Sequence, residues 1–173
     1  VASQGLRMER PEIYFGEKTY DYVVVNTKQD EFDYPKGDLN VYTHYQGKGG
    51  IKLNSFLRKA LFAFERSDMK LILSSQITNE SRLLYDRSID VMVKKIAPFL
   101  VFDQDPYLVV TDEGHLKWMI DAYTVSNQFP YSEKFNAKIN YIRNSVKVVV
   151  DAYDGTMDFY VMDIKDPLIK AYD

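Results

Sequence analysis

The side chains whose spacing comes nearest to a site in this 173-residue chain are carboxylates. Four of them, Asp103, Asp105, Asp112 and Glu113, lie in two turns at either end of one expected strand, and Asp-x-Asp can hold a hard cation through oxygen ligands. The spacing is not that of an EF-hand loop, which needs further ligands and a glycine at fixed positions. Because aspartates in turns commonly hydrogen-bond to nearby backbone, a turn role is favoured here over a metal role.

A second carboxylate pair comes from an expected C-terminal hairpin with its turn at residues 154–155. The turn admits a two-residue or a three-residue loop. The two-residue loop places Val150 opposite Phe159 and Asp151 opposite Asp158, and it sorts apolar and polar side chains onto separate faces, so it is favoured. Like charges directly opposite are unfavourable unless water, a basic side chain or a cation offsets them. Asp151 and Asp158 are therefore the candidate metal ligands, with two solvated aspartates as the alternative.

Tyrosine is the most overrepresented residue type, with 14 copies beside 10 phenylalanines. Its apolar ring and polar tip suit the rim of a core or a surface that meets a partner. Tyr34, Tyr42 and Tyr45 fall in a glycine-containing stretch near the N-terminus and are the candidate ligand-binding residues. The alternative is that these rings pack against the rest of a larger parent protein.

Motifs for covalent or metal-assisted catalysis are missing from the sequence. There is no cysteine, and the two histidines, His44 and His115, lie far apart, so a zinc site would depend on carboxylates. The glycine-rich stretch 47–50 does not have P-loop spacing and is predicted to be a flexible turn. Ser74-Ser75 has no surrounding glycines of a nucleophile elbow. We therefore expect no cofactor, and the sequence, which has no catalytic motif, favours a non-enzymatic function over an enzymatic one.

Composition narrows the class further. The formal net charge is −3 and the basic residues are dispersed, which argues against nucleic-acid binding. Hydrophobic residues make up 46% of the chain, enough for one real core. The longest apolar candidate, residues 56–64, is interrupted by Arg58 and Lys59 and is shorter than the roughly 20 residues of a membrane span. Residues 1–173 are thus expected to form a single soluble domain.

Two helices are expected. Apolar residues at 53, 56, 57, 60, 61 and 64 have helical spacing, and Asn54 or Ser55 can serve as N-cap, which predicts a helix over about 55–65. A second helix is predicted from an N-cap at Thr78 to the stop at Pro98. Both apolar stripes are expected to cover a sheet.

Strand signals occupy most of the remaining chain. A strand, turn, strand pattern at 13–25 is followed by an aperiodic stretch at 28–50 that is expected to be a long loop. A meander is expected at 99–122, with Trp118 on its core-facing side, and a hairpin at 146–163. The fold class is therefore α+β, with two main helices packed on antiparallel strands, a meander plus a C-terminal hairpin.

Several strings of the sequence are specific enough to suggest a family, and they occur in the family's order: PEIYFGE at 11–17, YQGKGG at 45–50, VKKIAPFL at 93–100 and NYIRNSVKV at 140–148. They resemble the bacterial membrane proteins called uncharacterised protein family 0182. The resemblance runs from about residue 11 to the end. It implies several transmembrane helices in an N-terminal part that is missing here, followed by a large extracytoplasmic region to which this segment belongs.

The resemblance carries no activity and gives no residue a catalytic or binding role. It implies a fragment of a membrane-anchored protein, located on the extracytoplasmic face of the cell membrane. The expected function is a binding or assembly module whose partner is the remainder of its own chain or another envelope protein, with membrane contact only through the missing transmembrane segments. The alternative is an extracytoplasmic hydrolase of a polymeric substrate, with two carboxylates as acid and base about 5 to 9 Å apart and tyrosines as subsites.

Overall fold

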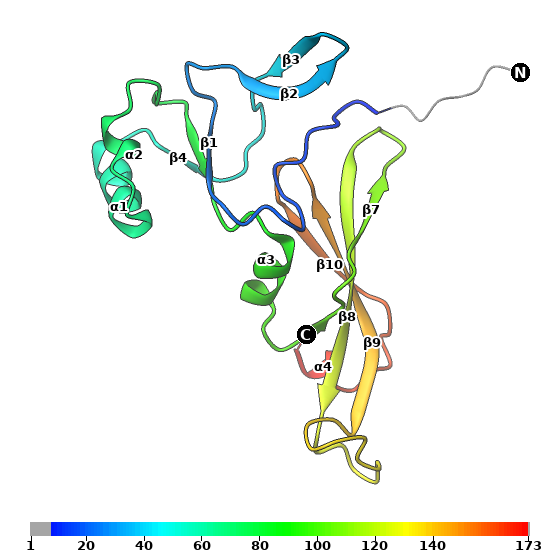
Figure 1. Ribbon diagram of the computed structural model, residues 1–173. Coiled ribbons are helices and arrows are strands. Elements are labelled where there is room, and N and C mark those ends of the chain that lie inside the picture. Colours follow the sequence, from blue (N-terminus) through cyan, green and yellow to red (C-terminus); the bar gives the residue numbers. More distant parts are fainter. Residues whose placement is uncertain (1–7, 173) are drawn as a thin grey trace, which may run out of the picture. The chain divides into compact units, whose positions relative to one another are not determined.

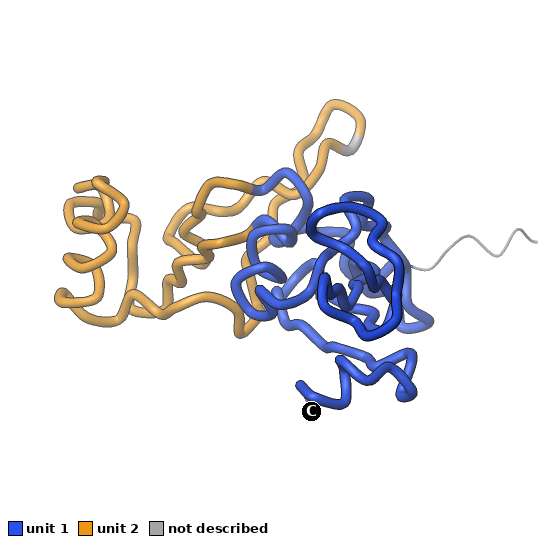
Figure 2. The backbone as a smooth tube through the Cα atoms, turned by 90° about the horizontal axis from the view of Figure 1, so that it is seen from below, with its two compact units in different colours: residues 1–19, 88–173 blue, residues 20–87 orange. Residues whose placement is uncertain are grey.

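The computed structural model describes residues 8–172. Contacts along the backbone divide the chain into two compact units (Figure 2). Unit 1 combines residues 1–19 with 88–173, and unit 2 is the intervening segment 20–87. Both units contain helices and antiparallel strands, which confirms the α+β class (Figure 1). No helix within the described range is both long enough and apolar enough to cross a membrane.

Unit 2 contains a small antiparallel sheet with β5 at its centre and a separate hairpin. The sheet has the order β1-β5-β4, formed by Val23–Val25, Arg82–Leu84 and Ile51–Lys52. The hairpin pairs β2 (Glu31–Lys36) with β3 (Leu39–Thr43). It lies where a long loop was expected, so that expectation was wrong. The register shifts between Phe32 and Tyr34, which interrupts the alternation that would have marked the strand.

The first helix, α1, spans Phe56–Arg66 and confirms the expected helix to within one residue. The Ser55 hydroxyl accepts a hydrogen bond from the Arg58 N–H at 3.3 Å, so Ser55 is the N-cap. The helix ends at Ser67, which adopts the left-handed conformation with a φ of 53°. A short helix, α2 (Lys70–Leu73), follows directly.

The second long helix, α3, spans only Ile89–Ile96, so the expected start at Thr78 was wrong. The first half of the expected helix is strand β5, in which Leu83 and Leu84 are both fully buried. Because β5 is the central strand of its sheet, neighbouring leucines can be buried on its opposite faces. Asp86, with a φ of 47°, then separates the strand from α3.

The main sheet of unit 1 has the order β10-β9-β8-β6, and β7 also pairs with β8 (Figure 1). Two eleven-residue strands, β8 and β9, form its centre. Both β6 and β7 pair with β8, at different parts of that strand, so β6 and β7 do not pair with each other as they would in the expected meander. The strands are Val101–Phe102 (β6), Tyr107–Val110 (β7), Leu116–Ser126 (β8), Tyr141–Asp151 (β9) and Met157–Val161 (β10).

The core of unit 1 lies between one face of this sheet and the helices α3 and α4, the latter spanning Ile169–Tyr172. Ile89 and Val93 of α3 belong to the same buried cluster as Ile120 and Val148 of the sheet. Trp118 packs against this cluster, as the strand alternation predicted, and its Nε1–H donates to the Phe15 carbonyl at 3.0 Å.

The segment expected as a first strand at 13–15 is instead irregular and bent, and two backbone hydrogen bonds hold it in place. The N–H groups of Tyr14 and Phe15 both donate to the Ala152 carbonyl at 2.9 Å. Ala152 and Tyr153 are buried beside this stretch, in the loop that joins β9 to β10. That packing explains why the loop is longer than the two residues expected.

The register of the β9–β10 hairpin therefore differs from the prediction. Val150 pairs with Met157, and Val148 pairs with Phe159. The Asp151 N–H donates to the Thr156 carbonyl at 2.9 Å, which leaves residues 152–155 as a four-residue loop. Gly155 closes it with a φ of 71°, where an added Cβ would lie 2.7 Å from the Phe15 ring.

Candidate interaction surfaces

Helix α1 packs against the rest of unit 2 through its less apolar side. Residues at positions 59, 62, 63 and 66 follow helical spacing and face inward. Ala63 is buried with Leu53, Leu71 and Leu83 in one hydrophobic cluster. The Phe62 ring lies 5.9 Å from the ring of Tyr85, centroid to centroid. A small alanine at the centre of this contact lets the helix approach closely, but it buries little apolar area.

The more apolar side of the helix faces solvent. Phe56, Leu57, Leu61 and Phe64 have exposed fractions of 73%, 67%, 60% and 87%. They lie at i, i+1, i+5 and i+8, on one face of the helix, and we call them the α1 outer face. The expectation that this stripe covers the sheet was therefore wrong. Met69 and Leu73, at the two ends of α2, are exposed as well.

Basic residues outnumber acidic ones along α1 and α2. Residues 56–73 contain Arg58, Lys59, Arg66 and Lys70 but only two acids, Glu65 and Asp68.

Both acids have partners inside unit 2. A Glu65 oxygen lies 3.4 Å from Arg66 Nη2. Asp68 accepts a short hydrogen bond from the Tyr22 hydroxyl and another from the Lys70 N–H at 2.9 Å. The pKa of Tyr22 is raised to about 12, mainly because the hydroxyl is buried and in second place because it donates a hydrogen bond to Asp68.

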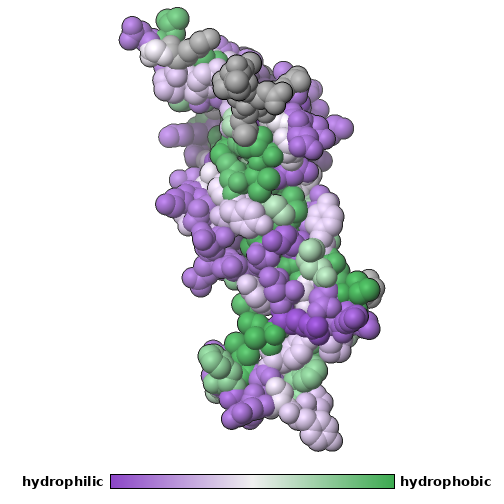
Figure 3. All heavy atoms as spheres, turned by 90° about the vertical axis from the view of Figure 1, so that its right-hand side faces the viewer, coloured by the Kyte–Doolittle hydropathy of each residue, from purple (hydrophilic) through white to green (hydrophobic). Residues whose placement is uncertain are grey.

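The second candidate surface is the tip of the β8–β9 hairpin, residues 127–142. Asn140 holds it together: the Phe129 N–H donates to Asn140 Oδ1 at 3.0 Å, and Asn140 Nδ2 donates back to the Phe129 carbonyl at 2.9 Å. The Phe129 and Tyr141 rings stack with their centroids 4.2 Å apart. Tyr131 and Phe135 project outward, with Phe135 86% exposed. Figure 3 shows hydrophobic side chains interleaved with hydrophilic ones at this lower end.

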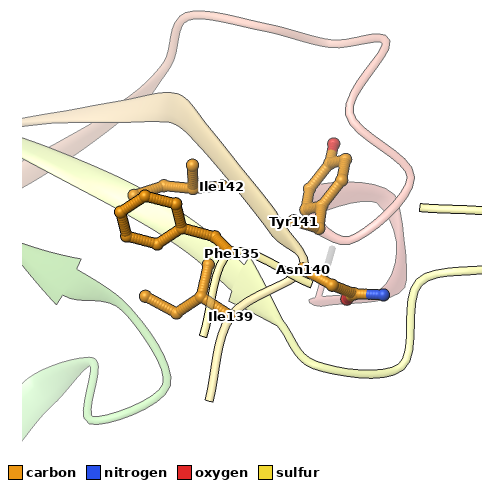
Figure 4. Close-up of a pocket in the computed structure, with 5 residues that line it drawn as sticks. All are labelled: Phe135, Ile139, Asn140, Tyr141 and Ile142. Carbon is orange, nitrogen blue, oxygen red and sulfur yellow. The ribbon is translucent and has the colours of Figure 1, made fainter. Parts of the chain in front are cut away.

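A hollow of about 400 Å³ lies at the tip, lined by Phe135 and residues 139–142. In Figure 4 the side chains of Phe135, Ile139 and Ile142 gather on one side, and the Tyr141 ring lies apart from them. Apolar side chains predominate in this lining, and it includes no ionisable group except the tyrosine hydroxyl. The hollow can hold an apolar group but offers nothing for acid or base chemistry.

A buried carboxylate anchors the base of this hairpin. Asp166 is fully buried and accepts hydrogen bonds from the hydroxyls of Thr124 at 2.5 Å, of Tyr141 at 2.8 Å, and of Ser145. Burial acts to raise the pKa of this carboxyl, but these three hydroxyls and the Leu168 N–H outweigh it and hold the pKa below its ordinary value. Because Thr124 and Ser145 are buried as well, this cluster is closed to substrates.

The three predicted tyrosines divide into two groups. Tyr34 and Tyr42 lie exposed on the β2–β3 hairpin and remain available for contact. Tyr45 is 1% exposed, and its hydroxyl accepts a hydrogen bond from the Gly49 N–H at 2.8 Å. The Tyr45 ring therefore belongs to the core, unlike the rings of the other two tyrosines.

The predicted carboxylate pair does not form. Asp158 pairs across the ladder with Val149, and Asp151 lies beyond it at the loop. Asp151 Oδ1 instead accepts the N–H groups of Tyr153 and Asp154, each at 2.9 Å, so it serves the turn. Across residues 8–172 no three carboxylate or histidine side chains converge as a metal site would require. The metal hypothesis for Asp151 and Asp158 thus loses its geometric basis.

The glycine-rich stretch behaves as a fixed turn. The Arg82 guanidinium donates hydrogen bonds to three of its carbonyl oxygens. Nε lies 2.6 Å from the Gly49 oxygen, and Nη2 lies 3.1 Å from the Gly50 oxygen and also donates to the Lys48 oxygen. The carbonyl oxygens thus surround the positively charged side chain of Arg82, and the Gly49 N–H donates to the Tyr45 hydroxyl. These hydrogen bonds leave no free backbone N–H at Gly49 for a phosphate, and they fix the turn that the sequence predicted to be flexible.

One polar trio lies on the sheet face of unit 1 away from the core. Lys147 Nζ lies 3.0 Å from Asp121 Oδ1 and 3.0 Å from the Tyr107 hydroxyl. The pKa of Lys147 is raised by its two hydrogen bonds, most of all by the one to Tyr107 and next by the one to Asp121. A lysine with a raised pKa stays protonated at neutral pH, so it cannot act as a nucleophile or a general base.

Comparison with known proteins agrees with the resemblance drawn from the sequence strings. Residues 1–173 match the Uncharacterised protein family (UPF0182). The chain belongs to this family. UPF0182 proteins of Desulforamulus reducens and Geobacter sulfurreducens are each 56% identical over 99% of this chain, which covers 19% of either relative. One from Pelotomaculum thermopropionicum is 56% identical over 96% of the chain and 18% of its own length.

The chain thus spans about a fifth of these relatives and is a segment of larger UPF0182 proteins. No solved structure matches it. Most of a UPF0182 polypeptide lies outside the matched segment, so in these longer proteins there is further chain that could cover the α1 outer face.

Proposed function

We propose that this UPF0182 segment is a non-catalytic binding or assembly module on the extracytoplasmic face of a bacterial membrane protein. The α1 outer face carries this proposal. Burying one large apolar side chain stabilises a protein by roughly 1.5–3 kcal/mol, and four of them stand exposed on one helical face. A contiguous exposed apolar patch of this kind is typical of an interaction site.

The partner we propose lies outside these 173 residues. Roughly four fifths of each relative is not covered by the matched segment. The remainder of the same polypeptide, or another envelope protein, is the partner that the module would meet. The extracytoplasmic placement rests on the family resemblance stated above.

The geometry favours this reading over the hydrolase. A glycosidase-type mechanism needs two carboxyl groups facing one cleft. Asp151 and Asp158 do not face each other, and the buried Asp166 is enclosed by hydroxyls. These placements support a module that binds rather than cleaves.

Cysteine labelling tests the proposal, because the chain has no cysteine of its own. Leu61→Cys should react rapidly with a maleimide in the 173-residue chain, and at least tenfold more slowly in a full-length UPF0182 protein that carries this segment. Leu39→Cys is the matched control, since Leu39 is 75% exposed on the β2–β3 hairpin. Equal rates at Leu61 in both contexts would contradict the proposal.

The same control position tests the location. In intact cells that make the full-length protein, a membrane-impermeant maleimide should label Leu39→Cys without lysis. Labelling only after lysis would place the segment on the cytoplasmic side and refute the extracytoplasmic assignment.

A further inference from the structure

We propose that β10 is the contact strand of a two-fold dimer, in which the β10 strands of two copies pair antiparallel and join the two main sheets into one. This strand belongs to unit 1, whereas the α1 outer face belongs to unit 2. The inference therefore goes beyond the proposed function, because it concerns a different surface and names a second copy of the chain as the partner.

The outer edge of β10 presents a row of backbone groups that the described part of the chain leaves without a pairing strand. β10 is the last strand in the sheet order and pairs only with β9. The Thr156 carbonyl and the Met162 N–H both bond to the β9 side. Because residues of an antiparallel strand alternate in this respect, Met157, Phe159 and Val161 direct their N–H and C=O groups away from β9. Such a row of donors and acceptors selects an extended polypeptide strand.

β10 also lacks the features that protect edge strands from such pairing, which are proline, lysine, a bulge or very short length. Its five residues include no proline or lysine, and its ladder with β9 runs without a register shift. In the same sheet β6 has only two residues, and β7 directly follows Pro106. β10 is thus the edge of this sheet that is most open to another strand.

The side chains of β10 add an apolar strip along this edge. Phe159 pairs with the buried Val148. Val161 pairs with the buried Val146, so both β10 side chains lie on the core-facing side of the sheet. They are nevertheless 36% and 47% exposed, because the buried cluster beneath α3 and α4 does not extend to them. A further strand at this edge would cover both.

The sequence of β10 is complementary to itself, which selects a second copy as that strand. In an antiparallel pair centred on Phe159, this residue meets its own copy and Met157 meets Val161. Asp158 meets Tyr160 on the other side of the sheet. Apolar side chains thus face apolar ones, and the only charged residue of the strand faces a tyrosine. The three residues with outward backbone groups all find partners in this register.

Neighbouring registers fit less well. Centring the pair on Asp158 would place two aspartates directly opposite each other, which their like charge opposes. Centring it on Tyr160 would place Asp158 opposite Met162 and so mix a charged with an apolar side chain. A shift by one residue would set outward backbone groups against inward ones. The register centred on Phe159 is therefore the one that we assign to the dimer.

Sedimentation equilibrium tests the inference. Five residues a side make a small contact beside the roughly 800 Å² per partner of standard interfaces, so we expect a weak, reversible dimer whose share rises with concentration. Phe159→Lys places two lysines at the two-fold axis and should weaken association at least tenfold. Leu108→Lys is the matched control, because Leu108 is 40% exposed on β7 of the same sheet, and it should leave association unchanged. Circular dichroism confirms that both variants are folded.

Two results of this experiment would overturn the inference. One is a wild-type mass that stays that of a monomer up to about 1 mM. The other is an equal loss of association from Phe159→Lys and Leu108→Lys, which would show that the contact does not involve β10.

Cysteine cross-linking tests the register, because the chain has no cysteine of its own. Asp158→Cys chains mixed with Tyr160→Cys chains should form mixed disulfide dimers at least tenfold faster than either variant forms them alone. The two positions would lie directly opposite, with Cα atoms about 4.5 Å apart, whereas two copies of position 158 would be diagonal neighbours about 8 Å apart, too far for a disulfide. Equal or faster linking of one variant to itself would overturn the inference.

The full-length protein separates a second copy from the other possible occupant, a strand of the same polypeptide. In membranes that contain a full-length UPF0182 protein with this segment, the same two cysteine variants should cross-link between copies. If Phe159→Cys is instead protected from a maleimide in a protein that does not cross-link, a strand of the same polypeptide covers the edge, and the dimer inference is overturned. Protection of Leu61→Cys is a separate readout, so the proposed function is judged independently.

Discussion

The Thr124 hydroxyl donates a hydrogen bond to Oδ2 of Asp166 at 2.5 Å, and neither residue is more than 1% exposed. Thr124 lies on β8, Ser145 and Tyr141 on β9, and Asp166 in the segment that leads into α4. One carboxylate therefore joins the two longest strands of unit 1 to its C-terminal helix. The cluster serves stability, since Thr124, Ser145 and Asp166 are all buried.

Asp166→Ala should destabilise unit 1 by roughly 3 kcal/mol or more, because it leaves three buried or partly buried hydroxyls without their acceptor. Urea unfolding at neutral pH measures the loss. Asp163→Ala removes a nearby acid that pairs with Arg143 and accepts one backbone N–H, that of Lys165, so it should cost less, about 1 to 2 kcal/mol. Similar losses in the two variants would contradict a special role for Asp166.

Asp166 should also make stability depend on acidic pH. Its folded-state pKa is below the ordinary value of 3.8, so its contribution is fully present above about pH 4 and is lost as the pH falls through the folded pKa. Asp166→Asn should therefore flatten the acid limb of the stability curve below pH 4. Unfolding free energies at pH 7 and pH 3 check this, and an unchanged slope in the variant would refute it.

Gly50→Ala should destabilise unit 2 by roughly 2 to 4 kcal/mol. Gly50 has a φ of 66°, and an added Cβ would lie 2.3 Å from the Leu83 carbonyl oxygen. Gly37 is a matched control, because its φ is 62° and nothing lies within 4 Å of the added atom. Gly37→Ala should cost only the left-handed strain of about 1 kcal/mol. Denaturant unfolding of both variants separates strain from clash, and equal costs would argue against the clash.

Trp118→Ala should cost roughly 3 to 5 kcal/mol, the usual range for truncating a large core side chain. Trp118→Phe keeps much of the ring packing but removes the Nε1 hydrogen bond to the Phe15 carbonyl, so about 1 kcal/mol is expected. Thermal unfolding of the two variants tests both contributions. An alanine variant with full stability would show that the indole lies outside the core.

Asp151→Ala should destabilise the β9–β10 hairpin by about 1 to 2 kcal/mol, because two backbone N–H groups lose their acceptor. This reverses the expectation from the two-residue register, in which neutralising Asp151 would relieve repulsion from Asp158. Asp158→Ala at the exposed position should change stability by less than about 0.5 kcal/mol. Stabilisation by the Asp151 change, measured by urea unfolding, would restore the rejected register.

The sequence predicted local structure well where the signal lies within a few residues. The cap at Ser55 and the strand alternation around Trp118 are local, and both were confirmed. The direction that α1 faces was not predictable in this way. Helical spacing identifies an apolar stripe, but it does not reveal whether the partner of that stripe lies within the segment.

Long-range relationships account for the other errors. Leu83 and Leu84 fit a helical stripe by spacing, and only the pairing of β5 with both neighbouring strands shows that they belong to a sheet. The Asp166 cluster was missed because Thr124 and Asp166 are 42 residues apart, and no local motif marks them as neighbours. The hairpin register failed because its loop packs on residues 14 and 15, far away in the sequence.

Heating should unfold the chain in one transition, as expected for a single domain. Unit 2 is inserted between residues 19 and 88 of unit 1, and unit 1 clamps the two ends of the insertion together. The Ile89 N–H donates to the Gly16 carbonyl at 3.1 Å, and the Ser88 hydroxyl donates to the Glu17 carbonyl at 3.4 Å.

When unit 1 unfolds, these hydrogen bonds break and the two ends of unit 2 are no longer held together. Holding the ends of a long segment together acts like a cross-link, which stabilises the folded segment by several kcal/mol. Unit 2 should therefore unfold together with unit 1. In scanning calorimetry, Trp118→Ala in unit 1 should lower the temperature of the whole transition, with no second peak left at the original position. A residual peak that Trp118→Ala does not move, but Gly50→Ala does, would show that unit 2 unfolds independently and that the chain comprises two cooperative domains.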